Sequence, residues 1–177
     1  MGKSPENDII NFRNQEKTMN GKKLILGVGN DILMDDGIGP RVVETLKEKM
    51  PLPGVDYITT TLGGLDILEI IVGYDWVAFI DAIKTADGVP GEVYEYTPAD
   101  FRETLHLSNL HDVNFISALE LGKKIGYKIP EAVHIFAIEI VEDQVFGEDF
   151  TPPLQARYDG IIREIHTAIL KSLELKN

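Results

Sequence analysis

The stretch from Lys23 to Pro40, KLILGVGNDILMDDGIGP, constrains the fold of this chain more than any other segment. Its apolar run from Leu24 to Val28 predicts a short buried strand, and the glycines that follow predict a sharp turn. A helix is predicted to begin near Ile38, directly after the adjacent carboxylates Asp35 and Asp36. The positive end of the helix dipole stabilises carboxylates at this position, so helix capping is one role open to them. Strand, turn and helix in this order are typical of the beginning of an α/β fold.

The same alternation of strand and helix continues along the chain. The run from Trp76 to Ile80, WVAFI, is apolar without interruption, which is typical of a strand covered on both faces. Charges alternate along 92–96, so this short strand is expected at an edge of the sheet, antiparallel to its neighbour. Strands are predicted at 24–28, 55–62, 76–80, 92–96 and 132–141, helices at 38–50, 65–72, 111–125 and 152–175, and irregular or partly helical structure at 98–110. We therefore expect an α/β three-layer sandwich, with a mostly parallel, twisted, five-stranded sheet and helices on both faces.

Length, charge and composition narrow the class of protein. A chain of 177 residues suits one domain, and we expect a polar extension at 1–21 outside the core and a single α/β domain at 22–177. The net charge of −12 disfavours nucleic acid and anionic membrane as partners, because a phosphate-binding surface needs clustered Lys and Arg. The absence of cysteine excludes thiolate metal sites and Cys nucleophiles. No apolar run approaches the roughly 20 residues of a membrane span and the N-terminus does not read as a signal peptide, so we expect a cytoplasmic protein without membrane insertion.

Several polar side chains are expected at one edge of the predicted sheet. In an open parallel sheet, ligands bind outside the carboxyl ends of the strands. Asp36 follows the first predicted strand, Asp81 follows the third, and His111 begins a helix whose preceding loop can reach the same edge. The same rule selects Asn30, Asp35, Gly63 and Gly64, of which the glycines are expected to serve close backbone approach. Two carboxylates and an imidazole are thus predicted to converge in one crevice.

Three kinds of site compete for this edge. A dinucleotide site is disfavoured, because the spacing puts Ile32 where the fingerprint requires a third glycine. A carboxylate dyad of Asp36 with Asp81 would suit general acid–base chemistry, since two close like charges share a proton. A metal site of two carboxylates and His111 would suit a borderline divalent ion such as Ni²⁺ or Zn²⁺ and leave coordination positions open. Composition and spacing do not choose between the last two.

Four ordered motifs of the chain resemble the [NiFe]-hydrogenase maturation proteases, over about Lys22 to Leu173. They are Gly27-Val28-Gly29-Asn30 with Asp35-Asp36-Gly37-Ile38-Gly39, the pair Gly63-Gly64, the strand end Phe79-Ile80-Asp81-Ala82, and the helix led by His111 with Phe115 and Leu119. The closing strand at 133–139 and the long final helix also fit this family. Two positions depart from the family pattern. The first acidic ligand is often Glu rather than Asp, and many members have Ser-Pro directly before the histidine, where this chain has Asn109-Leu110.

The resemblance implies an endopeptidase that removes a short C-terminal extension from a hydrogenase large-subunit precursor after nickel insertion. It implies that Asp36, Asp81 and His111 contact the metal, with His106 as the alternative histidine. The Ni²⁺ would be supplied by the substrate, and Zn²⁺ or Cd²⁺ could occupy the same site. Asp35 or an oxygen of Asp81 that does not bind the ion would accept the proton of the attacking water. With the metal-contacting Asp36, these carboxylates make Asp35, Asp36 and Asp81 the catalytic candidates. The alternative function is that of a non-catalytic nickel-sensing or docking module for hydrogenase assembly.

Overall fold

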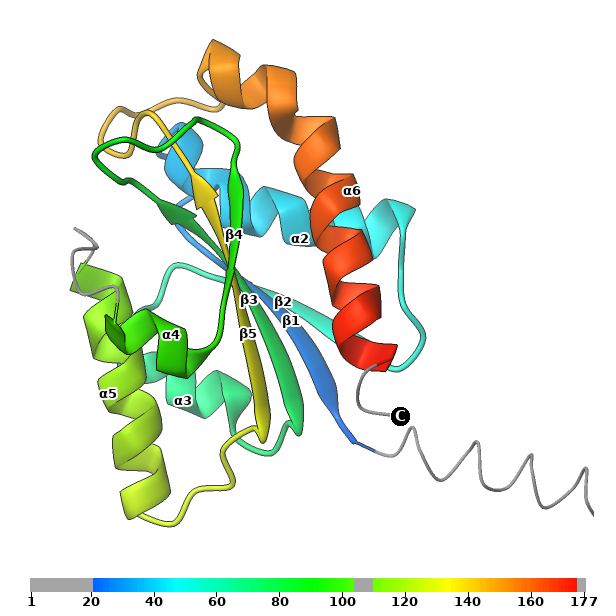
Figure 1. Cartoon of the computed structure of the whole chain (residues 1–177), viewed down its shortest axis with the longest axis vertical. Helices are drawn as coiled ribbons and strands as arrows, with labels where there is room; N and C mark the ends of the chain where they lie inside the picture. Colours follow the sequence, from blue (N-terminus) through cyan, green and yellow to red (C-terminus); the bar gives the residue numbers. More distant parts are fainter. Residues whose placement is uncertain (1–20, 104–109, 175–177) are drawn as a thin grey trace, which may run out of the picture.

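The computed structural model describes residues 21–103 and 110–174, and their centre is a five-stranded sheet (Figure 1). The strand order is β2-β1-β3-β5-β4, in which β1, β2, β3 and β5 are parallel and the edge strand β4 is antiparallel to β5. The strands are β1 (Lys23–Val28), β2 (Val55–Thr60), β3 (Trp76–Ile83), β4 (Val93–Tyr96) and β5 (Ala132–Glu139). The predicted mostly parallel sheet with one antiparallel edge strand is therefore confirmed.

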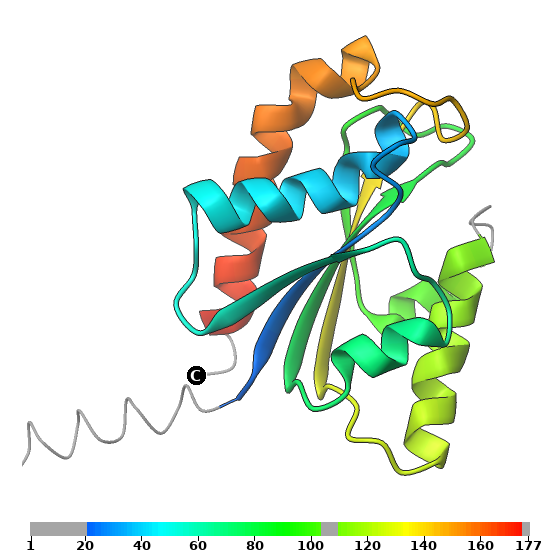
Figure 2. The same ribbon diagram turned by 180° about the vertical axis from the view of Figure 1, so that it is seen from behind.

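Helices cover both faces of the sheet and make it the middle of three layers. One face carries α2 (Ile38–Lys49), which follows the short 3₁₀ helix η1 (Asp35–Gly37), and α6 (Pro152–Glu174). The opposite face carries α3 (Asp66–Ile71), α4 (Pro98–Glu103) and α5 (Leu110–Lys124), as Figure 2 shows from behind. None of the helices described is both long and apolar enough to cross a membrane. The three-layer prediction is confirmed, and the predicted extension at 1–21 lies almost wholly outside the described residues.

Alternating side chains of the buried strands fill two separate cores. On the α2–α6 face, Trp76 and Phe136 pack among aliphatic side chains of both helices. On the α3–α5 face, Leu24, Leu26 and Phe79 do the same. A strand covered by helices on both faces must be apolar at every position, which explains the uninterrupted runs in β1 and β3. His134 lies beside Trp76, with the ring centroids 5.7 Å apart.

Strand β3 is longer than predicted. It continues through Asp81 to Ile83, because β5 pairs with it residue by residue as far as Glu139. In the sequence, the carboxylate of Asp81 after five apolar residues indicates that the strand has ended. In the fold, the strand ends only where its hydrogen bonds to β5 end. Asp81 therefore lies within a strand, where the backbone on both sides fixes its position.

Glycines let the first turn of α2 lie directly against the ends of β1 and β3. A Cβ atom on Gly39 would collide with the backbone carbonyl oxygens of both Val28 and Ile80. A Cβ on Gly29 would collide with the carbonyl of Asp36, and Gly29 has a φ of 141°, which other residues rarely adopt. Glycine is therefore required at positions 29 and 39 for this close packing of the backbone.

We expect the substitution Gly39→Ala to lower the free energy of unfolding by about 1–3 kcal/mol, because backbone must move to admit the new methyl group. Chemical denaturation followed by far-UV circular dichroism measures the change. The matched control is Gly160→Ala within α6, where a Cβ meets the guanidinium of Arg157 at 3.1 Å, the mobile end of a long side chain. Removing a glycine from a helix interior should stabilise that control by about 0.5–1 kcal/mol. Equal stabilities of the two variants would contradict the packing argument.

Candidate functional site

The strand order puts the switch point of the sheet between the carboxyl ends of β1 and β3, the place where the sequence predicts a crevice. From the carboxyl end of β1 the chain passes through η1 to α2 on one face, whereas from β3 it passes through β4 to α4 and α5 on the other face. β1 and β3 are neighbours in the sheet, so the connections diverge to opposite faces between them. Ligands of open α/β sheets bind at such a switch point. Asp36 in η1 and Asp81 in β3 both belong to this position.

Backbone packing places Asp36 at the rim of the crevice. Its Oδ2 accepts a hydrogen bond of 2.8 Å from the backbone N–H of Asn30, in the turn that follows β1. The side chain of Asn30 in turn accepts a hydrogen bond of 3.3 Å from the N–H of Ile32, which closes the turn. Asp36 is partly exposed, and its carbonyl lies against Gly29. The carboxylate is therefore held by its own strand–turn–helix motif and remains accessible.

Asp81 enters the same region from the centre of the sheet. Side chains alternate along β3, with Phe79 in the α3–α5 core and Ile80 in the α2–α6 core, so Asp81 lies on the α3–α5 face. Its Oδ1 accepts a hydrogen bond of 2.8 Å from the N–H of Ala82, and the side chain is partly exposed. Gly39 packs against Ile80, so the backbone segments that carry Asp36 and Asp81 are in contact.

The histidine of the predicted metal site is placed only by its backbone. His111 is the second residue of α5, which covers the sheet face that carries Asp81. The side chains of 101–116 lie outside those described, and so does all of His106. Among the described side chains, no three His, Asp or Glu residues are grouped as metal ligands. The set Asp36, Asp81 and His111 therefore stays a prediction.

Asp35, the other predicted catalytic carboxylate, is fully buried. Its Oδ2 accepts hydrogen bonds from the N–H groups of Val141 and Glu142, both at 3.1 Å, and from the hydroxyl of Thr151 at 2.8 Å. Its Oδ1 accepts from the N–H of Thr151 at 2.7 Å. All four donors belong to the segment 141–151, which we call the acidic loop. Asp35 thus ties the acidic loop to η1, and an enclosed carboxylate of this kind is poorly placed to meet a substrate.

Glu139 is a functional candidate that sequence reasoning missed. It ends β5 and is almost completely buried, and its carboxylate accepts from the N–H of Thr85 at 2.7 Å and the hydroxyl of Thr85 at 3.0 Å. It lies two residues beyond Ala137, the partner of Asp81 in the ladder, and on the same face of the sheet. The available signal was a single carboxylate inside the apolar run AVHIFAIEIV.

Two tyrosines of β4 accompany Glu139. The rings of Tyr94 and Tyr96 stack with centroids 6.1 Å apart. Desolvation, the hydrogen bond that Tyr94 donates to Glu92 at 2.9 Å, and the negative charge of Glu139 together raise the pKa of Tyr94 to about 12. Desolvation and the same carboxylates also raise the pKa of Tyr96. Both hydroxyls therefore remain neutral hydrogen-bond donors through the physiological pH range.

The chain is similar in sequence to proteins of hydrogenase maturation. No family model matches the chain. Hydrogenase 2 maturation protease from Escherichia coli (strain K12) is 27% identical over 158 residues, which are 84% of this chain and 91% of that protein. Hydrogenase expression/formation protein HoxM from Azotobacter vinelandii is 27% identical over 143 residues, 79% of this chain and 68% of that protein.

Solved structures share the fold. The hydrogenase maturating endopeptidase HybD from E. coli superposes with a TM-score of 0.69 at 24% identity, covering 85% of this chain and 93% of that one. The [NiFe] hydrogenase maturation protease HybD from Thermococcus kodakarensis gives a TM-score of 0.63 at 23% identity, covering 83% and 98%. The likeness extends over nearly the whole of each of these proteins, so the sheet and both helical layers correspond.

Proposed function

Because this chain belongs to the [NiFe]-hydrogenase maturation protease family, we propose that it is an endopeptidase that removes a C-terminal extension from the nickel-loaded precursor of a [NiFe]-hydrogenase large subunit. One observation carries the proposal beyond the family. The partly exposed carboxylates of Asp36 and Asp81 come from touching backbone segments at the switch point of the sheet. This is the place where an α/β sheet binds its ligand.

The substrate's own Ni²⁺ is the proposed recognition element. Carboxylate oxygens and an imidazole nitrogen suit a borderline divalent ion, and Asp36, Asp81 and His111 would complete the coordination of the ion carried by the precursor. An empty precursor offers these side chains nothing to bind. Recognition of the metal therefore makes cleavage conditional on nickel insertion, which is the property a maturation step requires.

Hydrolysis needs a proton acceptor near the attacking water. Asp35 is enclosed by four hydrogen bonds, so we assign this role to the carboxylate oxygen of Asp81 that does not bind the ion, in a residue that is partly exposed. A metal ion at the same place would polarise the scissile carbonyl or lower the pKa of the water. Asp36, fixed by the N–H of Asn30, would then serve to orient the ion.

The proposal predicts that only the nickel-loaded precursor is shortened. The purified chain is incubated with a [NiFe]-hydrogenase large-subunit precursor, loaded with nickel or nickel-free, and intact mass spectrometry follows both. We expect loss of a C-terminal peptide from the loaded precursor and an unchanged mass for the nickel-free one. Binding of the loaded precursor without a change of mass would replace the protease by the non-catalytic nickel-sensing or docking module. Cleavage of both precursors alike would remove nickel recognition from the proposal.

A further inference from the structure

We propose that the ring of Tyr94, in the edge strand β4, binds the C-terminal extension of the precursor where the extension leaves the carboxylate of Asp81. The ring would pack against an apolar side chain of the extension, a few residues beyond the bond that is cleaved. Tyr94 would then help to determine which extensions the endopeptidase accepts. The inference rests on the proposed function, because it assigns a further binding residue to the same reaction.

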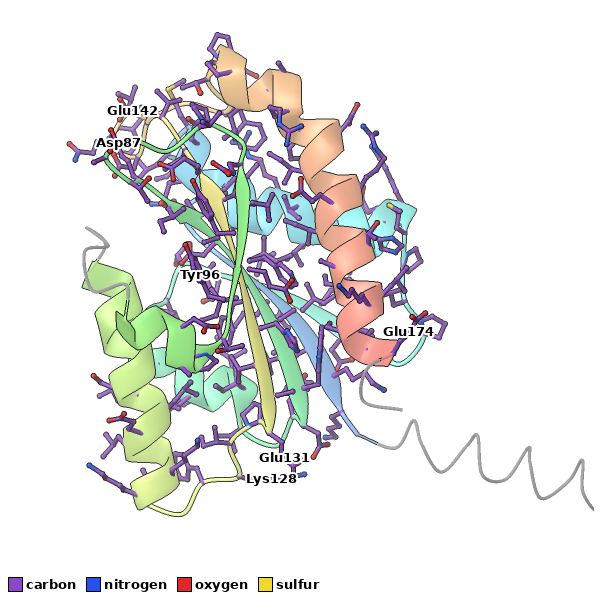
Figure 3. The ribbon with its side chains drawn as sticks, in the orientation of Figure 1. Asp87, Tyr96, Lys128, Glu131, Glu142 and Glu174 are labelled. Atoms are coloured by element: carbon purple, nitrogen blue, oxygen red, sulfur yellow. The ribbon has the colours of Figure 1, made fainter. Side chains whose placement is uncertain are left out.

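The sheet places Asp81 and Tyr94 in one row across three strands. Asp81 in β3 is opposite Ala137 in β5, and Ala137 is opposite Tyr94 in β4. Residues paired in this way have their side chains on the same face of a sheet. Tyr96, two residues further along β4, packs against the α3–α5 core, and Figure 3 shows it on that side of the sheet. Tyr94 and Asp81 therefore share the α3–α5 face.

The row is short enough for one polypeptide to contact both ends. Neighbouring strands are about 4.8 Å apart, so the backbones of Asp81 and Tyr94 are separated by about 10 Å. Ala137, which lies between them, contributes only a methyl group, and the side chains at both ends are partly exposed. An extended chain advances about 3.3 Å per residue, so Tyr94 would contact the substrate about three residues from the scissile bond.

The strand order indicates which part of the substrate meets Tyr94. In the order β1-β3-β5-β4, Asp36 follows β1 on one side of Asp81, whereas Tyr94 lies on the other side. The nickel-bearing part of the precursor would bind at Asp36 and Asp81, as proposed above. The extension would therefore continue from the scissile bond toward β5 and β4.

The ring of Tyr94 is held in place without a partner. The ring of Tyr96 stacks on it with the centroids 6.1 Å apart, and the Tyr94 hydroxyl donates a hydrogen bond of 2.9 Å to Glu92. A side chain that is ordered before binding loses little conformational entropy when a partner arrives. Tyrosine is also enriched where proteins bind one another. A partly exposed, ordered ring beside the proposed catalytic carboxylate is therefore suited to substrate binding.

Two carboxylates make this part of the face negative. Glu92 is exposed, and its carbonyl accepts a hydrogen bond of 2.9 Å from the N–H of the buried Glu139. Desolvation and these two carboxylates raise the pKa of the hydroxyls of Tyr94 and Tyr96, so negative charge lies close to both rings. An acidic side chain of the extension would be repelled here. We therefore expect an apolar residue to be favoured over an acidic one opposite Tyr94.

The test measures steady-state cleavage of the nickel-loaded precursor by Tyr94→Ala. We expect kcat/KM to fall about tenfold, through KM with kcat unchanged, because the ring binds the extension and takes no part in bond cleavage. Tyr94→Phe should retain the wild-type KM, because it keeps the ring. The matched control is Tyr127→Ala, at 49% exposure between α5 and β5, which should also retain it. An unchanged KM in Tyr94→Ala, or an equal rise in Tyr94→Phe or in the control, would overturn the proposal.

A precursor whose extension is shortened to one residue separates substrate binding from a loss of structure. The short extension ends before it reaches Tyr94, so the wild-type chain and Tyr94→Ala should cleave it with the same kcat/KM. An equal loss on the short and the full extension would contradict the proposed contact. For the wild-type chain, Asp as the third residue of the extension should raise KM relative to Leu, and equal KM values would contradict the selection against acidic residues.

Failure of this inference and failure of the proposed function give different results. If the wild-type chain cleaves the precursor and Tyr94→Ala cleaves it equally well, only the role of Tyr94 is wrong. If the wild-type chain binds the precursor without cleaving it, the endopeptidase proposal is wrong, and the affinities of the wild-type chain and of Tyr94→Ala for the full and the short extension decide the role of Tyr94. If the wild-type chain neither binds nor cleaves the precursor, both are wrong.

Discussion

Asp81→Asn is expected to reduce processing of the nickel-loaded precursor by about 10²–10⁴-fold, the range associated with loss of a general base. The physical reason is that an amide cannot accept the proton of the attacking water and is a poor ligand for a divalent ion. The fold should survive, because the Asn oxygen can still accept the hydrogen bond that Ala82 donates to Asp81 at 2.8 Å. Quantitative mass spectrometry of the precursor over time gives the rate.

Asp87→Asn is the matched control for this prediction. It makes the same chemical change six residues later, at an exposed position of the loop after β3 that Figure 3 labels. We expect the control to cleave at the wild-type rate. This result would show that the loss in Asp81→Asn comes from the position of Asp81 and not from the removal of one negative charge at this end of the molecule. Wild-type processing by Asp81→Asn, with both variants folded, would take Asp81 out of the site.

Asp35→Asn is expected to lower the free energy of unfolding by about 3–5 kcal/mol, although the two side chains have nearly the same shape. The carboxylate accepts hydrogen bonds from the backbone of Val141, Glu142 and Thr151 and from the Thr151 hydroxyl. An amide can offer only one of its two terminal atoms as an acceptor, and its NH₂ group would face donors in an enclosed site. Urea denaturation followed by the fluorescence of Trp76, the single tryptophan, measures the loss.

Asp31→Asn is the control for the buried carboxylate. Asp31 lies four residues earlier and is exposed, so the same substitution should change stability by less than about 0.5 kcal/mol. A variant of Asp35 as stable as this control would mean that the acidic loop does not depend on the carboxylate. A fully folded Asp35→Asn chain that has lost processing would instead return Asp35 to the catalytic candidates.

The fold could be predicted from the sequence because its elements follow local rules. The apolar runs of β1 and β3 identify strands that are buried on both faces, and the three-and-four spacing in the final helix identifies α6. The end of β3 could not be predicted in the same way. Asp81 is polar and ends an apolar run, but the ladder to β5 extends to Ile83 and Glu139 and depends on a partner strand distant in the sequence.

The candidate site was predictable in part. The rule for parallel sheets selects Asp36 and Asp81 by their positions after apolar runs of the sequence, and in the fold their backbone segments lie in contact. The inward position of Asp35 was not predictable, because its donors are more than a hundred residues away and three of the four are backbone N–H groups. Every residue except proline has a backbone N–H group, so the type of a residue does not show whether its N–H binds a distant carboxylate. The tie between Glu139 and Thr85 is hidden in the same way by a separation of 54 residues.

Asp35 and Asp36 are consecutive residues in different environments. The carboxylate of Asp35 is buried and binds Thr151, whereas Asp36 is partly exposed and binds the N–H of Asn30. Because Asp35 binds the acidic loop and Asp36 is the next residue, a movement of the loop changes the position of Asp36. A substitution in 141–151 that displaces the loop would shift Asp35, and with it Asp36, even where the substituted side chain makes no contact with the substrate. Random variants with weakened turnover should therefore include loop residues that make no contact with the precursor, and their defect should lie in geometry rather than in affinity.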